Sequence, residues 1–543
     1  MKRQFTTLIL LFIVVLLSAT SAELKAQNCG TDSVLYVRSG ASYANDDGLS
    51  WATAFPILDN AIDLARTCPN IKEIRVAQGQ YAPVLSSSNF TPQADRYYDI
   101  DFSIRIKGGY PFGGGTEAER NPSANFTQMT SYTSSGVRKT FFEISNASRV
   151  EIDGITLFGA TETAMEVFST TGEVILREVN FVYNHTSTYG MPGGLWVEST
   201  DMTIDGCEFD WNESTAQSIS TSGGAIQQNG GKLNITNSVF DNNLAYYNGG
   251  AIHYSGPEMT LINSLITDNE SVNGNSGGVY VTGSGTLQTI NTIFHNNNHT
   301  RSFGAALYIF SGVDADVVNC SFLLNLNYED HFLYASSSSS TDVLNNVFAT
   351  GFFGGSVSAS EVFTTSSVNA ADNFLYDFNA PGQSIADLYS ISFNEYSVPK
   401  CAPQIGEGSL AHYTYVGLDY NGNPRVYETI DAGALEYQLP HDTQQFILQP
   451  QSVSTLSGYD VEFQVELANC DIQSKNWYKD NNLLTGETDN TLSLTNISTA
   501  DQGVYDFRVT TSTGQIISNP ATLSIDCPSS IILYVDETAN GLA

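Results

Sequence analysis

Closely spaced aspartates are the residues of this sequence with the clearest potential for chemistry. They form three pairs: Asp46 and Asp47, Asp99 and Asp101, and Asp314 and Asp316. The i, i+2 spacing of two of these pairs places both side chains on one face of a strand. Hydrolysis of a glycosidic bond needs two carboxylates about 5–9.5 Å apart on one exposed face. No other polar group converges on any pair, so we assign no catalytic residue.

Metal and cofactor sites have no clear signature in the chain. Asp and Asn at turns are suitable Ca²⁺ ligands, but no Asp-x-Asp-x-Gly spacing is repeated, so the turns are expected to be solvated. The seven His are scattered without the spacing of metal ligands. We therefore predict no cofactor, with calcium as the one metal left open.

The charge balance restricts the partners. The 543 residues include 22 Lys+Arg and 57 Asp+Glu, which gives 22 − 57 = −35. A nucleic-acid ligand is excluded because it needs a concentrated basic surface. A uronate-cleaving lyase, which needs cations for the substrate carboxylates, is disfavoured for the same reason. A neutral glycan or another cell surface is the expected partner.

The N-terminus predicts export. Lys2 and Arg3 precede ten apolar residues, 8–17, and then small residues. That run is half of the roughly 20 residues needed to span a bilayer, so residues 1–26 are expected to be a signal peptide cleaved after Ala22 or Ala26. No other segment is apolar enough to span a membrane. We expect a secreted or outer-surface protein.

A repeat dominates the middle of the chain. A cluster of small residues is followed about 16 residues later by an apolar residue, and by Asn three residues further on. The small-residue clusters are Gly193-Gly194, Gly223-Gly224-Ala225-Ile226, Gly249-Gly250-Ala251-Ile252, Gly277-Gly278-Val279 and Gly304-Ala305-Ala306. The apolar and Asn positions are Phe181/Asn184, Phe209/Asn212, Phe240/Asn243, Ile266/Asn269, Phe294/Asn297 and Phe322/Asn325. The mean period is near 28 residues.

This period and the alternation of apolar with polar residues predict an all-β fold, a right-handed parallel β-helix. Three short strands and their turns make one coil, and coils stack at about 4.8 Å. The Phe positions should then form an inward ladder, and the Asn positions should lie at a turn, bonded to backbone or to the next Asn. Residues 139–437 are assigned to these coils.

The segment 27–138 is expected to cap the solenoid and to form its first coils. Leu58, Ala61, Ile62 and Ala65 follow i, i+3, i+4, i+7, which predicts an amphipathic helix. An open solenoid end exposes unpaired strand edges, and a helix placed there would cover them.

A different pattern begins after residue 437. Short alternating segments within 440–526 predict a β-sandwich of about 90 residues. Residues 527–543 repeat the start of the mature chain: Leu35-Tyr36-Val37 follows Cys29 at the same offset as Leu533-Tyr534-Val535 follows Cys527. We expect 527–543 to be the truncated start of a second β-helix module, with an anchoring or sorting domain beyond residue 543.

The cysteines suggest one disulfide. Cys29 and Cys68 are candidates for a bond in the cap, whereas Cys207 and Cys320 lie four coils apart, about 19 Å, far above the roughly 7 Å limit. These two are expected to be buried thiols. A bond between Cys470 and Cys527 stays open.

Two resemblances follow from these motifs. The Gly-Gly-Ala-Ile and Phe-x-x-Asn series, with Gly108-Gly109-Tyr110 and Asp419-x-x-Gly422-Asn423-Pro424-Arg425, resembles bacterial surface β-helix proteins with polymorphic outer membrane protein repeats. Asp501-x-Gly503-x-Tyr505-x-Phe507 with Trp477 resembles the end of an immunoglobulin-like domain. Here Tyr505 is the tyrosine corner, and Phe463 and Phe507 stand in place of the intersheet disulfide.

The resemblance implies a large non-catalytic surface protein for adhesion or glycan contact. The alternative is a pectate-lyase-like polysaccharide lyase or glycoside hydrolase with an accessory immunoglobulin-like domain, since the same fold houses both classes. Asp46-Asp47 and Arg105-Ile106-Lys107 match polygalacturonase motifs by letters only, because both precede the coils where such a site would lie.

Overall fold

The computed structural model describes most of the chain between residues 29 and 526. The described residues are 29, 33–42, 46–83, 97–130, 140–217, 222–300, 304–325, 331–337, 339–350, 368–377, 390–392, 395–397, 402, 404, 407–409, 417–425, 430–436, 446–467, 472–511 and 514–526. The expected signal peptide and the expected second module, 527–543, lie outside this set.

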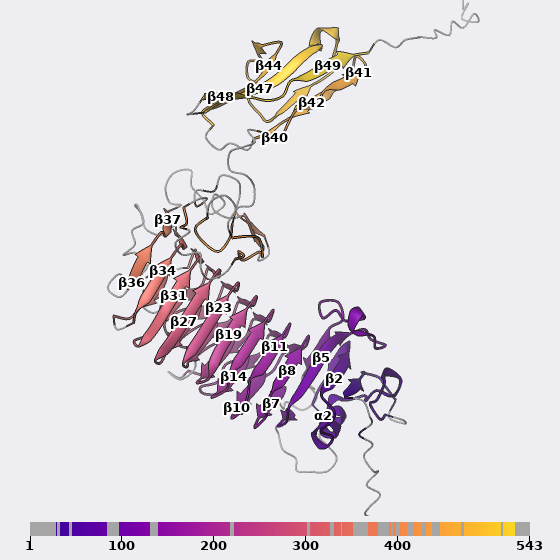
Figure 1. The fold of residues 1–543 in the computed structure, drawn as a ribbon, viewed down its shortest axis with the longest axis vertical. Helices are drawn as coiled ribbons and strands as arrows, with labels where there is room; N and C mark the ends of the chain where they lie inside the picture. Colours follow the sequence, from indigo (N-terminus) through magenta and orange to yellow (C-terminus); the bar gives the residue numbers. More distant parts are fainter. Residues whose placement is uncertain are drawn as a thin grey trace, which may run out of the picture.

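Parallel strands wound into successive coils form the larger part of the molecule, and in Figure 1 they stack one after another from β2 to β36. One face is a 12-stranded sheet: β1 (Val34–Val37), β2 (Glu73–Ala77), β5 (Ile104–Tyr110), β8 (Val150–Asp153), β11 (Val174–Arg177), β15 (Met202–Asp205), β19 (Lys232–Thr236), β23 (Glu258–Ile262), β27 (Gly285–Ile290), β31 (Val313–Val318), β34 (Thr341–Leu344) and β36 (Val368–Ala371).

Two further sheets complete each coil. The 9-stranded sheet contains β4 (Tyr98–Ile100), β7 (Phe142–Ser145), β10 (Met165–Phe168), β14 (Leu195–Glu198), β18 (Ile226–Asn229), β22 (Ile252–Ser255), β26 (Val279–Thr282), β30 (Leu307–Ile309) and β33 (Leu333–Ala335). The 11-stranded sheet contains β3 (Gly79–Tyr81), β6 (Thr127–Thr130), β9 (Thr156–Phe158), β12 (Asn180–Val182), β16 (Glu208–Asp210), β20 (Val239–Asp241), β24 (Leu265–Thr267), β28 (Ile293–His295), β32 (Ser321–Leu323), β35 (Val347–Thr350) and β37 (Phe374–Asp377).

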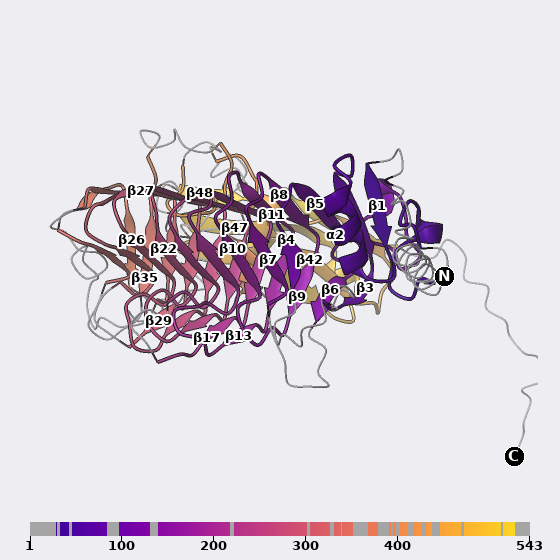
Figure 2. The same cartoon turned by 90° about the horizontal axis from the view of Figure 1, so that it is seen from below.

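A short fourth sheet follows the 11-stranded one, and Figure 2 shows it along one edge of the coil stack. Its strands are β13 (His185–Thr186), β17 (Glu213–Ser214), β21 (Leu244–Ala245), β25 (Glu270–Ser271) and β29 (Asn298–His299). Strands alternate inward apolar residues with outward ones, as Lys232–Thr236 does, because successive side chains of a strand point to opposite faces.

The N-terminal end of the solenoid carries the helix α2 (Leu58–Thr67) and the short 3₁₀ turns η1 (Trp51–Thr53) and η2 (Glu117–Glu119). The apolar side of α2 is buried in the solenoid core and consists of Leu58, Ala61, Ile62 and Ala65. The helix contacts β1, β2 and β4. The helix therefore covers the end of the coil interior.

The C-terminal part is a β-sandwich with its own core, and the prediction of an all-β fold with a parallel β-helix followed by a sandwich is confirmed. Its strands are β40 (Phe446–Leu448), β41 (Val453–Thr455), β42 (Val461–Gln464), β43 (Glu466–Leu467), β44 (Ser474–Lys479), β45 (Asn482–Leu483), β46 (Thr491–Leu494), β47 (Gly503–Thr511), β48 (Gly514–Ile517) and β49 (Ala521–Ile525), with the 3₁₀ turn η5 (Thr499–Asp501). The buried Trp477 ring lies 5.0 Å from Phe507, and Tyr505 Oη donates to Asp501 O at 2.6 Å.

Between the coils and the sandwich lies the hairpin of β38 (Ser390–Ser392) and β39 (Glu395–Ser397), followed by residues 417–425 and 430–436. We call the described residues 395–397, 417–425 and 430–436 the C-terminal arm. Ala432, Ala434 and Leu435 pack with Leu265 and Ile293 in one buried cluster. Val239 of β20 also packs against this cluster, so the arm covers the outer face of the 11-stranded sheet from β20 onward.

Candidate functional site

The candidate site is built on the corner where the 11-stranded sheet turns into the 5-stranded one. An asparagine lies buried at this corner in six consecutive coils: Asn184, Asn212, Asn243, Asn269, Asn297 and Asn325. Each Nδ2 of the first five donates to the Oδ1 of the next Asn at 2.8–2.9 Å. Each Nδ2 also donates to a backbone carbonyl of the preceding coil, such as Leu157 O for Asn184 at 3.1 Å and Phe209 O for Asn243 at 2.8 Å. The ladder fixes the corner backbone in every coil.

An aromatic stack lies inside the same sheet. The ring centroids of Phe181 and Phe209 are 4.5 Å apart, those of Phe209 and Phe240 4.7 Å, and those of Phe294 and Phe322 4.8 Å, with the rings nearly parallel in each pair. Ile266 occupies the register position between Phe240 and Phe294. All are buried, so these positions hold the sheet in register and are closed to ligands.

The residue before each ladder Asn adopts the left-handed conformation. Asn242, Asp268 and Asn296 have φ near +50° there, which Asn and Asp tolerate. Tyr183 and Trp211 occupy the same position with φ of +54° and +52°. Large side chains are disfavoured in this region by roughly 1–2 kcal/mol, and such strain is concentrated at functional sites. Two coils thus hold aromatic rings where the backbone geometry opposes them.

These two rings continue into an exposed row. Tyr183 and Trp211 are 54% and 50% exposed and stack at 6.1 Å, and Phe158 of the preceding coil, 40% exposed, lies 6.0 Å from Tyr183. We call Phe158, Tyr183 and Trp211 the aromatic row. It lies over β9, β12 and β16, on the part of the 11-stranded sheet that the described C-terminal arm does not cover.

Carboxylates lie beside the aromatic row. Asp210 and Asp241 occupy directly opposed positions on β16 and β20, and neighbouring strands of a parallel sheet are about 4.8 Å apart. The pKa of Asp210 is raised to about 6, mainly because the side chain is partly buried and further because the charges of Asp241 and Glu208 lie close to it. Asn242 Nδ2 donates to Asp241 Oδ1 at 2.8 Å. Two neighbouring carboxyl groups, one of them with a raised pKa, therefore lie at the edge of an exposed aromatic platform.

A second aromatic series runs along the outer face of the 9-stranded sheet. Tyr280, Tyr308 and Tyr334 stack at 4.8 and 4.7 Å, and His253 lies 5.3 Å from Tyr280. Tyr280 and Tyr308 are each only 8% exposed, because the neighbouring rings cover their faces. This stack stabilises the sheet and offers little ring surface to a ligand.

The aspartate pairs found in the sequence do not form a site. Asp99 and Asp101 both pair with Arg66, at 3.2 and 2.8 Å, which fixes the end of α2 to the first coils. Asp47 Oδ1 accepts from Leu49 N within its turn, at 3.0 Å. Asp314 and Asp316 accept single hydrogen bonds, from Ser340 N at 3.2 Å and Gln288 Nε2 at 3.4 Å. These bonds are local structural contacts.

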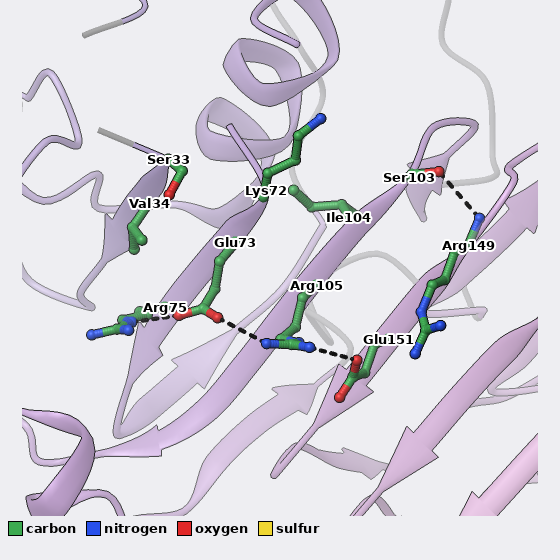
Figure 3. A pocket seen from close by; sticks show the side chains of 10 residues that line it. All are labelled: Ser33, Val34, Lys72, Glu73, Arg75, Ser103, Ile104, Arg105, Arg149 and Glu151. Carbon is green, nitrogen blue, oxygen red and sulfur yellow. Dashed lines mark hydrogen bonds and ion pairs between the residues drawn. The ribbon is translucent and has the colours of Figure 1, made fainter. Parts of the chain in front are cut away.

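A pocket of about 450 Å³ lies on the outer face of the 12-stranded sheet, over its first coils. Figure 3 shows Arg105 at its centre between Glu73 and Glu151. Arg105 pairs with Glu73 at 3.5 Å and with Glu151 at 3.0 Å. The other residues that line the pocket are Ser33, Val34, Lys72, Arg75, Ser103, Ile104 and Arg149. We call it the cationic pocket. Lys107, two residues after Arg105, pairs with Glu117 and does not line it.

The cysteines lie away from both surfaces. Cys29 and Cys68 form a disulfide, as predicted, and join the start of the chain to the end of α2. Cys207 and Cys320 are buried free thiols whose pKa burial raises to about 12. Cys401, Cys470 and Cys527 lie outside the described residues.

Within the described ranges, three or more His, Cys, Asp or Glu side chains nowhere gather in a group suited to a metal ion. No described helix has the length and apolar character needed to cross a membrane. The two surfaces above are therefore candidates for binding organic ligands through rings, carboxylates and cations.

Sequence reasoning missed the aromatic row and the Asp210–Asp241 pair. Both carry a signal in the repeat: the residue before the ladder Asn is aromatic in two coils, and Asp follows the ladder Phe in Phe209-Asp210 and Phe240-Asp241. Aligning the coils by their ladder residues would have exposed both.

Comparison with known proteins names no family. No family model matches the chain, and no curated protein is similar to it. Among solved structures, a chimeric titin Z1Z2-Z1Z2 tandem is 21% identical over 15% of this chain and 49% of its own, with a TM-score of 0.14. Tandem Ig repeats of Dlar are 19% identical over 19% and 59%, with a TM-score of 0.15. The chain thus spans about half to three fifths of these structures.

Proposed function

We propose that this chain is an exported or cell-surface β-helix protein that binds a neutral glycan along the aromatic row and serves in adhesion. The observation that carries the proposal is the pair Tyr183 and Trp211, exposed rings held in a left-handed backbone conformation. Flat aromatic faces pack against the apolar faces of sugar rings, and an exposed apolar patch on a folded protein marks an interaction surface.

The chemistry of the surroundings supports a neutral ligand. Glu208, Asp210 and Asp241 lie around the row, so an anionic polysaccharide would meet like charge. Carboxylate oxygens accept hydrogen bonds from sugar hydroxyls. The Cys29–Cys68 disulfide supports an oxidising location, as does the signal-like N-terminus.

The domain organisation belongs to the same proposal. We infer cap, coils, an immunoglobulin-like domain and the start of a second module at the boundaries expected from the sequence. The Tyr505 hydrogen bond and the core of Phe463, Trp477 and Phe507 support the immunoglobulin-like assignment. The Gly-Gly and Phe-x-x-Asn series supports the polymorphic outer membrane protein repeat type.

The binding proposal is tested with Trp211→Asn and Tyr183→Asn on an array of neutral glycans. Asn suits the left-handed position, so both variants should keep or gain thermal stability. They should nevertheless bind at least about tenfold more weakly, since a buried aromatic contact in an interface is worth about 2 kcal/mol or more. The measurement is the dissociation constant for the best array glycan, with the melting temperature beside it.

A matched control lies on another coil. Leu324 adopts the same conformation, φ +52°, on the arm-covered half of the sheet, so Leu324→Asn makes the same backbone change without touching the row. Its binding should equal that of the wild type. If the wild type binds no glycan or cell surface, or if all three variants bind equally, the proposal fails.

A second function is supported by Asp210 and Asp241. Retaining glycosidases place two carboxyl groups about 5–5.5 Å apart, with one pKa raised so that this group donates a proton to the leaving oxygen. Asp210, with its pKa near 6, fits the acid, and Asp241 fits the nucleophile. In the same array experiment, release of reducing ends that is lost in Asp241→Asn would favour hydrolysis over binding alone.

A further inference from the structure

The cationic pocket reverses the charge of the molecule locally. Lys72, Arg75, Arg105 and Arg149 line it with only Glu73 and Glu151 opposite, a balance of 4 − 2 = +2 in a chain of −35. The reversal is confined to the pocket, because residues 72–177 hold ten of the 22 cations but also twelve carboxylates, 10 − 12 = −2. The positive balance is therefore a property of the pocket itself.

The two carboxylates of the pocket are already fully engaged. Glu73 pairs with Arg75 at 2.6 Å and with Arg105 at 3.5 Å. Glu151 pairs with Arg105 at 3.0 Å and with Arg177 at 3.4 Å. These pairs are on a partly exposed surface and orient the guanidinium of Arg105 across the pocket floor, as Figure 3 shows. They leave no carboxylate of the pocket for the remaining two cations.

Lys72 and Arg149 are those remaining cations. Within the described part of the chain, neither side chain has an ion pair or a side-chain hydrogen bond. The backbone atoms of these two residues connect neighbouring coils. Lys72 N donates to Ser33 O at 2.8 Å, and Ile104 N donates to Arg149 O at 3.2 Å. The two side-chain charges are thus not needed to close the coils, and both line the same hollow.

We propose that this pocket binds a small ligand through a single carboxylate, attracted by Lys72 and Arg149, the two lining cations that have no described partner. A guanidinium offers a carboxylate two parallel hydrogen bonds, and an ammonium adds a point charge. The volume of about 450 Å³ falls within the range of about 300–1,000 Å³ for small-ligand sites. A long polyanion is disfavoured, because it would run onto the acidic remainder of the solenoid.

The site is independent of the aromatic row. The pocket lies on the 12-stranded sheet over β1, β2, β5 and β8, whereas the row lies on the 11-stranded sheet over β9, β12 and β16. The binding of a neutral glycan to the aromatic row and of a small acid to the cationic pocket therefore depends on different residues. Either proposal can fail while the other holds.

The test is calorimetric titration of the full chain with glucuronic acid, with glucose as the uncharged sugar and N-acetylglycine as a carboxylate without a sugar. Glucuronic acid should bind and glucose should not, and the affinity should fall as salt rises, because the charges are exposed. N-acetylglycine binding equally well would place recognition in the carboxylate alone, and weaker binding would show that the sugar ring contributes.

The decisive variant is Lys72→Gln with Arg149→Gln, which should lower the affinity at least about tenfold without lowering the melting temperature, since neither side chain has a described partner. The matched control, Lys232→Gln with Lys475→Gln, removes the same charge far from the pocket and should bind like the wild type. Binding of glucose as tight as that of glucuronic acid, no binding of either carboxylate at millimolar concentration, or an unchanged affinity in the double variant would overturn the proposal.

Discussion

At the scale of single residues, the position before the ladder Asn is not occupied by the same kind of residue in every coil. Every coil needs a left-handed residue before its ladder Asn, because the backbone changes direction there. Half of the six coils meet the need with Asn or Asp, whereas Tyr183, Trp211 and Leu324 do not. The ladder Asn residues themselves are not left-handed, since their side chains are committed to the neighbouring coils. An exposed aromatic ring at this costly position, found in two adjacent coils, is the best residue-level sign of a binding surface.

The candidate acid pair shows why such a site is hard to find in a sequence. Asp210 and Asp241 are 31 residues apart, whereas the i, i+2 aspartates first draw attention. Proximity in a solenoid comes from the coil period, so neighbours in space are about one repeat apart. The exposure of the row could not be foreseen either, because it depends on where the C-terminal arm stops covering the sheet.

Asp210 should oppose folding at neutral pH. Its pKa in the folded chain, about 6, lies above the unfolded value near 3.8, so its favourable contribution is complete below about pH 3.8 and is lost as the pH rises through 6. Asp210→Asn should therefore raise the free energy of unfolding at pH 7, by up to about 1 kcal/mol given the partial solvation of the group, and leave it unchanged near pH ~3, below the unfolded pKa.

Denaturant unfolding of Asp210→Asn and wild type at pH ~3 and pH 7 measures this. Glu270→Gln, on β25 and not part of the pair, is the control for removing one carboxylate elsewhere on the solenoid. An equal stability difference at both pH values would contradict the assigned pKa.

At the element scale, the repeat fixes most of the architecture. The period near 28 residues, the alternation in segments such as 232–236 and the Phe-x-x-Asn spacing were enough to predict stacked parallel coils, because strand pairing and inward ladders repeat with the sequence. The β-hairpin and turns of the C-terminal arm could not be predicted this way, since they lie outside the repeat and pack through single contacts such as Ala434 N to Ser321 Oγ at 2.9 Å.

The Asn ladder should contribute more to the stability of the coils than the exposed residues beside it do. Asn243 accepts from Asn212 N and Nδ2 at 3.0 and 2.9 Å, and donates to Phe209 O and Asn269 Oδ1. Asn243→Ala would leave several of these buried groups without partners, at about 1–3 kcal/mol each, so unfolding should become easier by at least about 3 kcal/mol.

Chemical denaturation of the full chain measures this loss. Asn180→Ala on the outer side of β12 is the control and should stay within about 0.5 kcal/mol of wild type. A loss for Asn243→Ala no larger than that of the control would mean that water replaces the ladder bonds at little cost.

At the scale of the whole molecule, the net charge does not show how the charges are distributed over the surface. A charge of −35 excluded nucleic acid, yet the same chain forms the cationic pocket on its first coils. The sequence total also says nothing about cooperativity, whereas the structure separates the buried residues of the solenoid from those of the sandwich, with Trp477 and Phe507 in a core of their own.

Two cores that share no residue should unfold in two transitions, and the cap disulfide should act on one of them. Cys29 and Cys68 are 39 residues apart, and closing a loop of that length removes about 4 kcal/mol of unfolded-chain entropy. Cys29→Ser with Cys68→Ser should therefore lower the solenoid transition and leave the sandwich transition in place, as scanning calorimetry would show. Because each coil contacts only its neighbours, the loss should begin at the cap, with faster amide exchange in α2 than in β19. A single transition, or an equal shift of both, would show that the two parts fold as one unit.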